Sequence, residues 1–279
     1  MNSEFSKAQA GSYAFIGGGQ MATALISGLI RAGLPPRAIV VFDPDAAQQE
    51  RLHASLGVDV GGRVDDRLAG AEVVVWAVKP QVLCQAVQQA SAHLRAPLHI
   101  SIAAGIRCVE LSGWLASARV IRAMPNTSAL IGASVTGLTA APEAAPADRR
   151  VAQDVLATTG HCFWVENDER LNAVTAVSGS GPAYVFHFLE AFQAAAQAVG
   201  FDEVTARELV LKTVAGAVQQ AQSGDAFGTL RERVTSKHGT TEAALAQLDA
   251  ARTAQALKDA VAAACTRAEV ISREFAQQA

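Results

Sequence analysis

The sequence predicts an α/β fold, with an N-terminal Rossmann-type, mostly parallel sheet followed by an all-α C-terminal domain. From Gly11 to about Val165, short apolar runs alternate with helical stretches, which is typical of a parallel sheet covered by crossover helices. After about Asn167 the strand signals stop, and long segments rich in alanine, leucine and valine follow. We therefore expect two domains, a dinucleotide-binding domain over residues 11–166 and a helical domain over residues 167–279.

The apolar runs of the N-terminal half have the length of buried strands. Residues 71–78 are almost continuously apolar, as a strand that is buried on both faces must be. Residues 98–102 and 119–124 repeat this pattern, whereas residues 81–94 and 108–115 have the length and mixed polarity of helices. The predicted order is strand, helix, strand, helix.

A glycine-rich motif lies between the first strand and the first helix. Residues 13–16 form a short apolar strand, and Gly17-Gly18-Gly19-Gln20-Met21-Ala22 leads into a helix over residues 23–32. In this GxGxxA pattern the first glycine permits a tight turn, the second lets backbone amides approach a pyrophosphate, and the alanine allows close packing. The setting predicts a nicotinamide dinucleotide site. For Gly18, which the pattern leaves free, a turn residue that binds nothing remains the alternative.

Asp43 follows the second strand, residues 40–42, where a carboxylate can accept hydrogen bonds from the hydroxyls of the adenosine ribose. A 2′-phosphate would meet like charge there, and no arginine follows until Arg51. The cofactor can thus be NADPH or NADH, and Asp43 favours use of NADH. The alternative for Asp43 is a helix N-cap within Asp43-Pro44-Asp45.

Three other strand ends carry residues that could meet a ligand, because ligands of doubly wound sheets bind beyond the carboxyl ends of the strands. These segments are Ala77-Val78-Lys79-Pro80, Ala103-Ala104-Gly105 and Met124-Pro125-Asn126. From the residues alone, Lys79 could equally be a solvated charge and Asn126 a turn residue.

The last segment carries an apolar stripe that predicts packing against another helix, either within the chain or across a dimer. Its members alternate at spacings of three and four: Ala254, Leu257, Val261, Ala264, Ala268, Ile271 and Phe275.

Composition limits the classes of function. The chain has 279 residues, and 50% of them are hydrophobic, enough for a sizeable core. Its net charge of -3 comes with no run of like charge, so we expect small-molecule partners and neither nucleic acid nor membrane. Residues 1–9 have too little apolar length for a signal peptide or membrane anchor.

Cysteine and histidine spacing argues against metal and disulfide chemistry. The four cysteines fit neither paired metal ligands nor a dense disulfide framework, and we interpret them as free thiols in a reducing cytoplasm. The six histidines include no HExxH and no pair at helical ligand spacing. The sequence therefore predicts a cytoplasmic protein that uses no metal.

Four further motifs occur in a specific order, at residues 77–81, 122–132, 178–184 and 234–245. Together with the Rossmann-type start they resemble pyrroline-5-carboxylate reductase, and the resemblance runs from about Tyr13 to the C-terminus. It implies reduction of the cyclic imine 1-pyrroline-5-carboxylate by NAD(P)H to L-proline, the last step of proline biosynthesis. It also implies a homodimer, often assembled into higher homo-oligomers.

The resemblance further implies roles for individual segments. Lys79-Pro80 would border the nicotinamide ribose, and the Met124-Pro125-Asn126 turn would lie near the nicotinamide and the substrate. Ser180, with its neighbours Gly179, Gly181 and Pro182, would form the floor beneath the ring.

The loop Ser236-Lys237-His238-Gly239-Thr240-Thr241 would bind the substrate carboxylate on backbone amides at a helix start, with the Thr241 hydroxyl facing the imine nitrogen as the catalytic contact. Amides at a helix N-terminus favour an anion without a buried cationic side chain. An imine accepts hydride poorly until its nitrogen is protonated or hydrogen-bonded, which is the role expected of Thr241. The structural alternative, a plain helix start at these threonines, is compatible with that role.

One position departs from the family's loop, which commonly has two glycines before the threonines where this chain has His238-Gly239. If residue 238 needs a positive φ, its β-carbon costs about 1 kcal/mol. Our hypothesis is that His238 lies at the edge of the carboxylate pocket and lends it a pH-dependent charge. A solvent-facing side chain is the alternative.

Three other functions are compatible with a Rossmann start and a helical second domain. A 3-hydroxyacid or phosphogluconate-type dehydrogenase would carry a catalytic Lys-x-x-Asn pair in the helical domain. Here the residue three positions after Lys212 is Ala215, so that pair is absent. A reductase of other cyclic imines and a non-catalytic NAD(P)-sensing module remain. Oxidation of NAD(P)H when pyrroline-5-carboxylate is added distinguishes an enzyme from a sensor.

Overall fold

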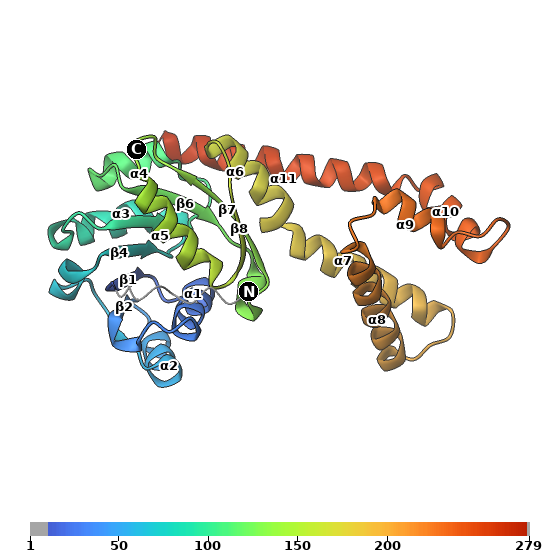
Figure 1. Cartoon of the computed structure of the whole chain (residues 1–279), viewed down its shortest axis with the longest axis horizontal. Helices are drawn as coiled ribbons and strands as arrows, with labels where there is room; N and C mark the ends of the chain where they lie inside the picture. Colours follow the sequence, from blue (N-terminus) through green and yellow to red (C-terminus); the bar gives the residue numbers. More distant parts are fainter. Residues whose placement is uncertain (1–10, 278–279) are drawn as a thin grey trace. The chain divides into compact units, whose positions relative to one another are not determined.

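The chain forms two compact units in the computed structural model, which describes residues 11–277 (Figure 1). The first unit runs to Ser180 and resumes at Ala264, and the second is Gly181–Ala263. The first unit therefore includes residues 167–180 and the end of the last helix, which the sequence analysis assigned to the helical domain. The prediction made for residues 1–9 lies outside the described residues.

An eight-stranded sheet forms the centre of the first unit, in the order β3-β2-β1-β4-β5-β6-β7-β8. The strands up to β6 are parallel, β7 is antiparallel to β6, and β8 is parallel to β7, which confirms the predicted mostly parallel sheet. The bounds are β1 (Tyr13–Ile16), β2 (Ile39–Phe42), β3 (Asp59–Gly61), β4 (Val73–Trp76), β5 (Leu98–Ser101), β6 (Val120–Met124), β7 (Ser134–Ala140) and β8 (Gly160–Trp164).

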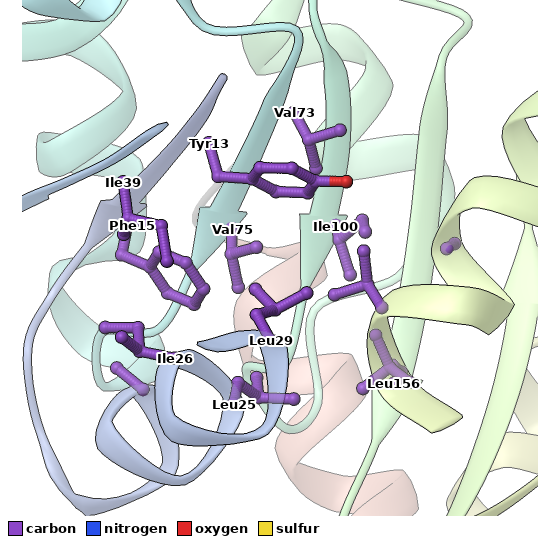
Figure 2. Close-up of a cluster of buried hydrophobic side chains, with 14 of the residues drawn as sticks. Tyr13, Phe15, Leu25, Ile26, Leu29, Ile39, Val73, Val75, Ile100 and Leu156 are labelled. Atoms are coloured by element: carbon purple, nitrogen blue, oxygen red, sulfur yellow. The ribbon is translucent and has the colours of Figure 1, made fainter. Parts of the chain in front are cut away.

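Helices cover both faces of this sheet because consecutive strand residues point to opposite sides. Tyr13 and Phe15 of β1 belong to a core shared with α1, α2 and α5, whereas Ala14 and Ile16 belong to a second core with α3 and α4. Figure 2 shows the first core, with side chains of α1 packed against the strands. The helices are α1 (Gln20–Arg31), α2 (Ala46–Leu56), α3 (Pro80–Ala90), α4 (Cys108–Leu115), α5 (Pro146–Ala157) and α6 (Asp168–Val174), which continues into the π-helical turn η6 (Thr175–Gly179).

The second unit is helical, as the sequence predicts, and glycines lie between its helices. Gly200 and Gly224 adopt positive φ between helices, and Gly239 precedes α10. The helices are α7 (Gly181–Ala198), α8 (Glu203–Ala221), α9 (Phe227–Arg233), α10 (Thr240–Ala250) and the first part of α11 (Thr253–Ala276). Among the described helices of the whole chain, none is long and apolar enough to cross a membrane.

The predicted apolar stripe of α11 has different surroundings along its length. Ala268 is buried in the first unit, and Ile271 and Phe275 lie against the loop after β5, so this end has a partner within the chain. Leu257, near the start of the helix, is 55% exposed. The sequence left open whether the stripe packs within the chain or across a dimer. For the C-terminal end of the stripe, the partner lies within the chain.

A buried histidine lies at the centre of the sheet. Trp76 on β4 donates a hydrogen bond from Nε1 to Nδ1 of His99 on β5, at 3.2 Å. Burial lowers the pKa of His99 to about 4, and the positive charge of Arg119 acts in the same direction. His99 is thus neutral at neutral pH and serves as a hydrogen-bond acceptor in the core.

The pKa of His99 predicts a loss of stability in acid. Because the folded-state pKa of about 4 lies below the ordinary value of 6.5, the unfolded chain takes up the proton first. The free energy of unfolding is unaffected by protonation of His99 above the ordinary pKa. It falls by roughly 3 kcal/mol as pH decreases toward 4. Urea titrations at pH 7 and near pH 4 should show less acid destabilisation for His99→Gln, which can still accept from Trp76. Equal acid sensitivity in both proteins would contradict this assignment.

Candidate active site

The carboxyl ends of four strands lie along one edge of the sheet. The parallel register aligns Ile16 of β1 with Trp76 of β4, Trp76 with Ser101 of β5, and Ser101 with Arg122 of β6. The segments that follow these residues therefore emerge at the same edge. This brings together the glycine-rich motif and the three strand-end segments predicted from the sequence.

Gly17 fits a position that no other residue could occupy without strain. Its φ is +95°, and its amide donates to the carbonyl of Phe42 at 2.8 Å. A β-carbon there would lie 2.6 Å from the carbonyl oxygen of Ala77, which is backbone and cannot move aside easily. The turn after β1 is therefore packed directly against the segment after β4.

Open space lies in front of the first turn of α1. Gly19 is the N-cap residue and makes no side-chain cap, and a β-carbon on it would meet no atom within 4 Å. In the described part of the chain, the amides of Gln20 and Met21 have no hydrogen-bond acceptor. Free amides at a helix N-terminus attract an anion, so this geometry fits the pyrophosphate of a dinucleotide. A hollow lined by Gly19, Gln20 and Arg51 opens beside it.

Asp43 holds the glycine-rich loop. Its carboxylate accepts the amide of Gly18 at 2.7 Å and the amide of Asp45 at 2.9 Å. The N-cap of α2 is Asp45, which accepts from Ala47, so the N-cap alternative for Asp43 is wrong. Each carboxylate oxygen can accept a second hydrogen bond, which leaves Asp43 able to meet a ribose hydroxyl.

Gly18 is not a free position. A β-carbon there would lie 2.7 Å from Cδ1 of Leu52 and 3.3 Å from the Asp43 carboxylate. Leu52 comes from α2 and is fully buried, so it has little room to give way. The glycine is therefore required by packing behind the loop, a constraint that the GxGxxA pattern does not express.

Lys79 occupies the N-cap position of α3, directly before Pro80 at the first helical position. Its side chain is exposed and makes no cap hydrogen bond. The predicted roles as a solvated charge and as a residue bordering a ligand are both compatible with this position.

Two of the motifs that are far apart in the sequence meet at the end of β6. Asn126 is 8% exposed, and its Nδ2 donates to the carbonyl of Ser178 at 3.0 Å. A β-carbon on Gly179 would lie 3.0 Å from Cε of Met124. The turn after β6 and the turn η6 thus form one wall, next to which Ser180 closes η6 by donating to Thr175.

The loop before α10 belongs to the second unit and has a defined hydrogen-bond pattern. The amide of Gly239 donates to the carbonyl of Ser236 at 3.1 Å, and the amide of His238 donates to Glu242 at 2.6 Å. Within the described residues, the amides of Thr240 and Thr241 at the helix start have no acceptor. These two amides at the start of α10 are therefore available to an anion.

His238 adopts the backbone conformation that the sequence analysis considered. Its φ is +59°, so the β-carbon is present where the family's loop commonly has glycine. The side chain is 95% exposed, with Nδ1 4.0 Å from Glu242. In this chain the ring faces solvent, as the alternative predicted.

Sequence reasoning missed a buried ion pair beneath the site. Arg122 on β6 is 3% exposed and donates to Asp168 at the start of α6, and its Nε has no partner among the described residues. The same carboxylate also accepts the amide of Cys108, at 3.1 Å. Burial and the negative charge of Asp168 raise the pKa of the Cys108 thiol to about 12, so this thiol is not a nucleophile. An arginine inside an otherwise apolar strand is the signal that was available.

Comparison with known proteins adds two family matches. Residues 168–271 match the family described as pyrroline-5-carboxylate reductase dimerisation. Residues 12–105 match the family described as NADP oxidoreductase, coenzyme F420-dependent.

Whole-chain relatives agree with these matches. A pyrroline-5-carboxylate reductase of Haemophilus influenzae is 41% identical over 266 residues, which cover 94% of this chain and 98% of that protein. The structure of a pyrroline-5-carboxylate reductase from Coxiella burnetii is similar with a TM-score of 0.86 and 33% identity, covering 95% of this chain and 99% of that one. A Plasmodium falciparum pyrroline carboxylate reductase with NADP bound has the same fold, with a TM-score of 0.84, 24% identity and coverage of 94% and 98%.

Because the space at Gly19 is open, we expect Gly19→Ala to weaken dinucleotide binding without impairing folding. The φ of Gly19 is -62° and suits alanine, so Gly19→Ala should change Tm by about 1 °C or less. Its methyl group would occupy the space before the α1 amides and should raise the Kd for NADH about tenfold. Gly17→Ala is the comparison, because it should lower Tm by several degrees through overlap with Ala77. Unchanged NADH binding by Gly19→Ala in a fluorescence titration would refute this placement of the pyrophosphate.

Proposed function

The chain belongs to the pyrroline-5-carboxylate reductase family, and on this basis we propose which of its residues carry the reaction. It reduces the cyclic imine 1-pyrroline-5-carboxylate to L-proline, with NAD(P)H as the hydride donor, in the last step of proline biosynthesis. The single observation that supports the placement of the cofactor is the uncapped start of α1, with open space at Gly19.

The cofactor's polar groups are assigned to the edge of the sheet. The amides of Gln20 and Met21 bind the pyrophosphate, and Asp43 accepts from the adenosine ribose while it holds the amide of Gly18. Lys79 and Pro80 border the nicotinamide ribose. The carboxylate of Asp43 disfavours a 2′-phosphate through like charge, which supports use of NADH.

The substrate's carboxylate is assigned to the free amides of Thr240 and Thr241. The amides of His238 and Gly239 already have acceptors, which leaves the helix-start amides of Thr240 and Thr241 as our candidates within the predicted binding loop. The wall formed by Met124, Asn126 and Gly179 lies next to the nicotinamide, because it stands at the carboxyl end of β6. These groups orient the reactants, which is the main contribution that a protein makes to hydride transfer.

The hydroxyl of Thr241 is assigned to the imine nitrogen. Reduction places a pair of electrons on that nitrogen, so a hydrogen-bond donor or a bound proton is needed as the amine forms. Thr241 is half-buried at the second position of α10, next to the free amides. Its hydroxyl does not lose its proton, so the substrate binds as the iminium, with a proton taken from solvent. The hydroxyl then donates a hydrogen bond to the nitrogen lone pair that hydride transfer creates.

The chain forms a homodimer or a higher homo-oligomer. Large apolar side chains of the second unit are exposed in the single chain, among them Phe186, Phe188 and Phe227. Within that unit, only Ala206 and Val210 are buried among the residues described. We propose dimers as the building block and a reducing cytoplasm as the location, the latter because the four cysteines are free.

The proposed function predicts oxidation of NADH and NADPH when pyrroline-5-carboxylate is added, followed by absorbance at 340 nm, with L-proline as the product. The ratio of kcat/KM for the two cofactors tests the assignment of Asp43, and we expect NADH to be used at least as well as NADPH. Cofactor binding without oxidation would favour a sensor. A strong preference for NADPH would contradict the argument from Asp43 and leave the reaction itself intact.

Thr241→Ala should lower kcat/KM for the imine about tenfold without abolishing activity, because one neutral hydrogen bond contributes about 1 kcal/mol. Thr241→Ser retains the hydroxyl and should restore most of the activity. The measurement is steady-state kinetics at saturating NADH. If Thr241→Ala has the kcat/KM of the wild type, the hydroxyl is not the donor to the imine nitrogen.

A further inference from the structure

The end of α11 lies directly against the loop that follows β5. Gly105 in this loop has a φ of +82°, and a β-carbon on it would overlap the side chain of Ile271. The same β-carbon would lie 3.5 Å from Cδ2 of Phe275, which also packs against the core beneath α3 and α4. All of these residues belong to the first unit. The last helix of the chain thus supports this loop from behind.

Two polar contacts, one buried and one part-buried, fix the position of this helix end and of the loop. Ser272 and Asn172 of α6, both 5% exposed, exchange hydrogen bonds of 3.2 and 3.3 Å. Asp168 of α6 accepts the amide of Cys108 at the far end of the loop. Buried hydrogen bonds between elements fix the direction of a helix more narrowly than apolar packing does. The end of α11 therefore has one defined position on α6.

Burial within the loop is one-sided. Ala103 is 4% exposed and Ile106 is fully buried, and Gly105 is buried as well, whereas Ala104 remains half-buried. The loop begins where β5 ends, at the edge that carries the other cofactor segments. With Ile271 behind it, the backbone at Gly105 cannot retreat from that edge, because the space it would enter is filled.

We propose that Ile271 and Phe275 are positioning residues for the cofactor: by filling the space behind Gly105 they hold the Ala103–Gly105 loop against the nicotinamide half of NAD(P)H. The inference rests on the proposed function and on the sequence-based prediction that the Ala103-Ala104-Gly105 segment meets the cofactor at this edge of the sheet. Neither side chain touches the cofactor. Each acts through the loop backbone, and its loss allows the loop to occupy conformations that bind the dinucleotide less well.

The test is Ile271→Ala, compared with Ile271→Val and with Leu115→Ala. Leu115 is half-buried and packs against the same core as Phe275. It lies at the last turn of α4, away from the loop, so Leu115→Ala is a control for the loss of packing that Ile271→Ala causes. We expect Ile271→Ala to raise the Kd and KM for NADH about fivefold. The KM for pyrroline-5-carboxylate should change less than twofold, Ile271→Val should retain most of the affinity, and Leu115→Ala should lower Tm alone.

A second variant tests whether the effect passes through Gly105. Gly105→Ala should weaken NADH binding strongly, and the added weakening should be smaller in the Ile271→Ala background, where the overlapping side chain is gone. Additive effects on the Kd would contradict transmission through this contact. Equal Kd values for Ile271→Ala and Leu115→Ala at matched Tm would overturn the proposal.

The Kd is measured by NADH fluorescence without turnover, so this result is independent of the reaction assigned to the chain. A wild-type protein that binds NADH but does not reduce pyrroline-5-carboxylate would contradict the proposed function and not this inference. A wild-type protein that binds no dinucleotide would contradict both.

Discussion

In-register parallel pairing of β1, β4, β5 and β6 is the constraint on which the site depends. Parallel strands must each be followed by a crossover connection, so their carboxyl ends and the loops after them share one edge. Most of these strands are four residues long and pair from end to end, so their last residues align closely. This alignment alone brings residues that are far apart in the sequence to the same edge. The free amides of α1 then face the same space as the turn after β6.

The parts of this arrangement that depend on neighbouring residues in the sequence could be predicted. The run Tyr13–Ile16 and the glycines after it identify a strand, a turn and a helix start, because apolar period and glycine conformation act within a few residues. Helix α4 was bounded correctly for the same reason, since Cys108–Leu115 is flanked by turn-forming segments. The positive φ of His238 followed from a comparison of loop motifs.

The parts that depend on distant contacts could not be predicted. Gly18 is required because Leu52 of α2 packs behind it, and no pattern near Gly18 contains that information. The hydrogen bonds of Asp43 to two backbone amides are likewise a product of the folded loop. The buried hydroxyl of Ser134 on β7, which accepts the amide of Asn126 at 3.2 Å, comes from a strand too rich in threonine and glycine to stand out as core. The helical unit was predicted as helical, but its sparse burial reflects an assembly that one chain does not contain.

The helix α11 gives the first unit a discontinuous chain: the sheet is complete by Trp164, yet the support behind Gly105 comes from Ile271 and Phe275, near the chain end. During synthesis the ribosome releases the sheet long before it releases these residues. The nascent N-terminal unit must therefore wait, with the surface behind its β5 loop uncovered, until Ile271 and Phe275 have been synthesised. A chain that stopped before Ile271 would retain every strand of the sheet and lack this support behind Gly105. Such a chain exposes apolar surface behind this loop, as incompletely folded chains generally do.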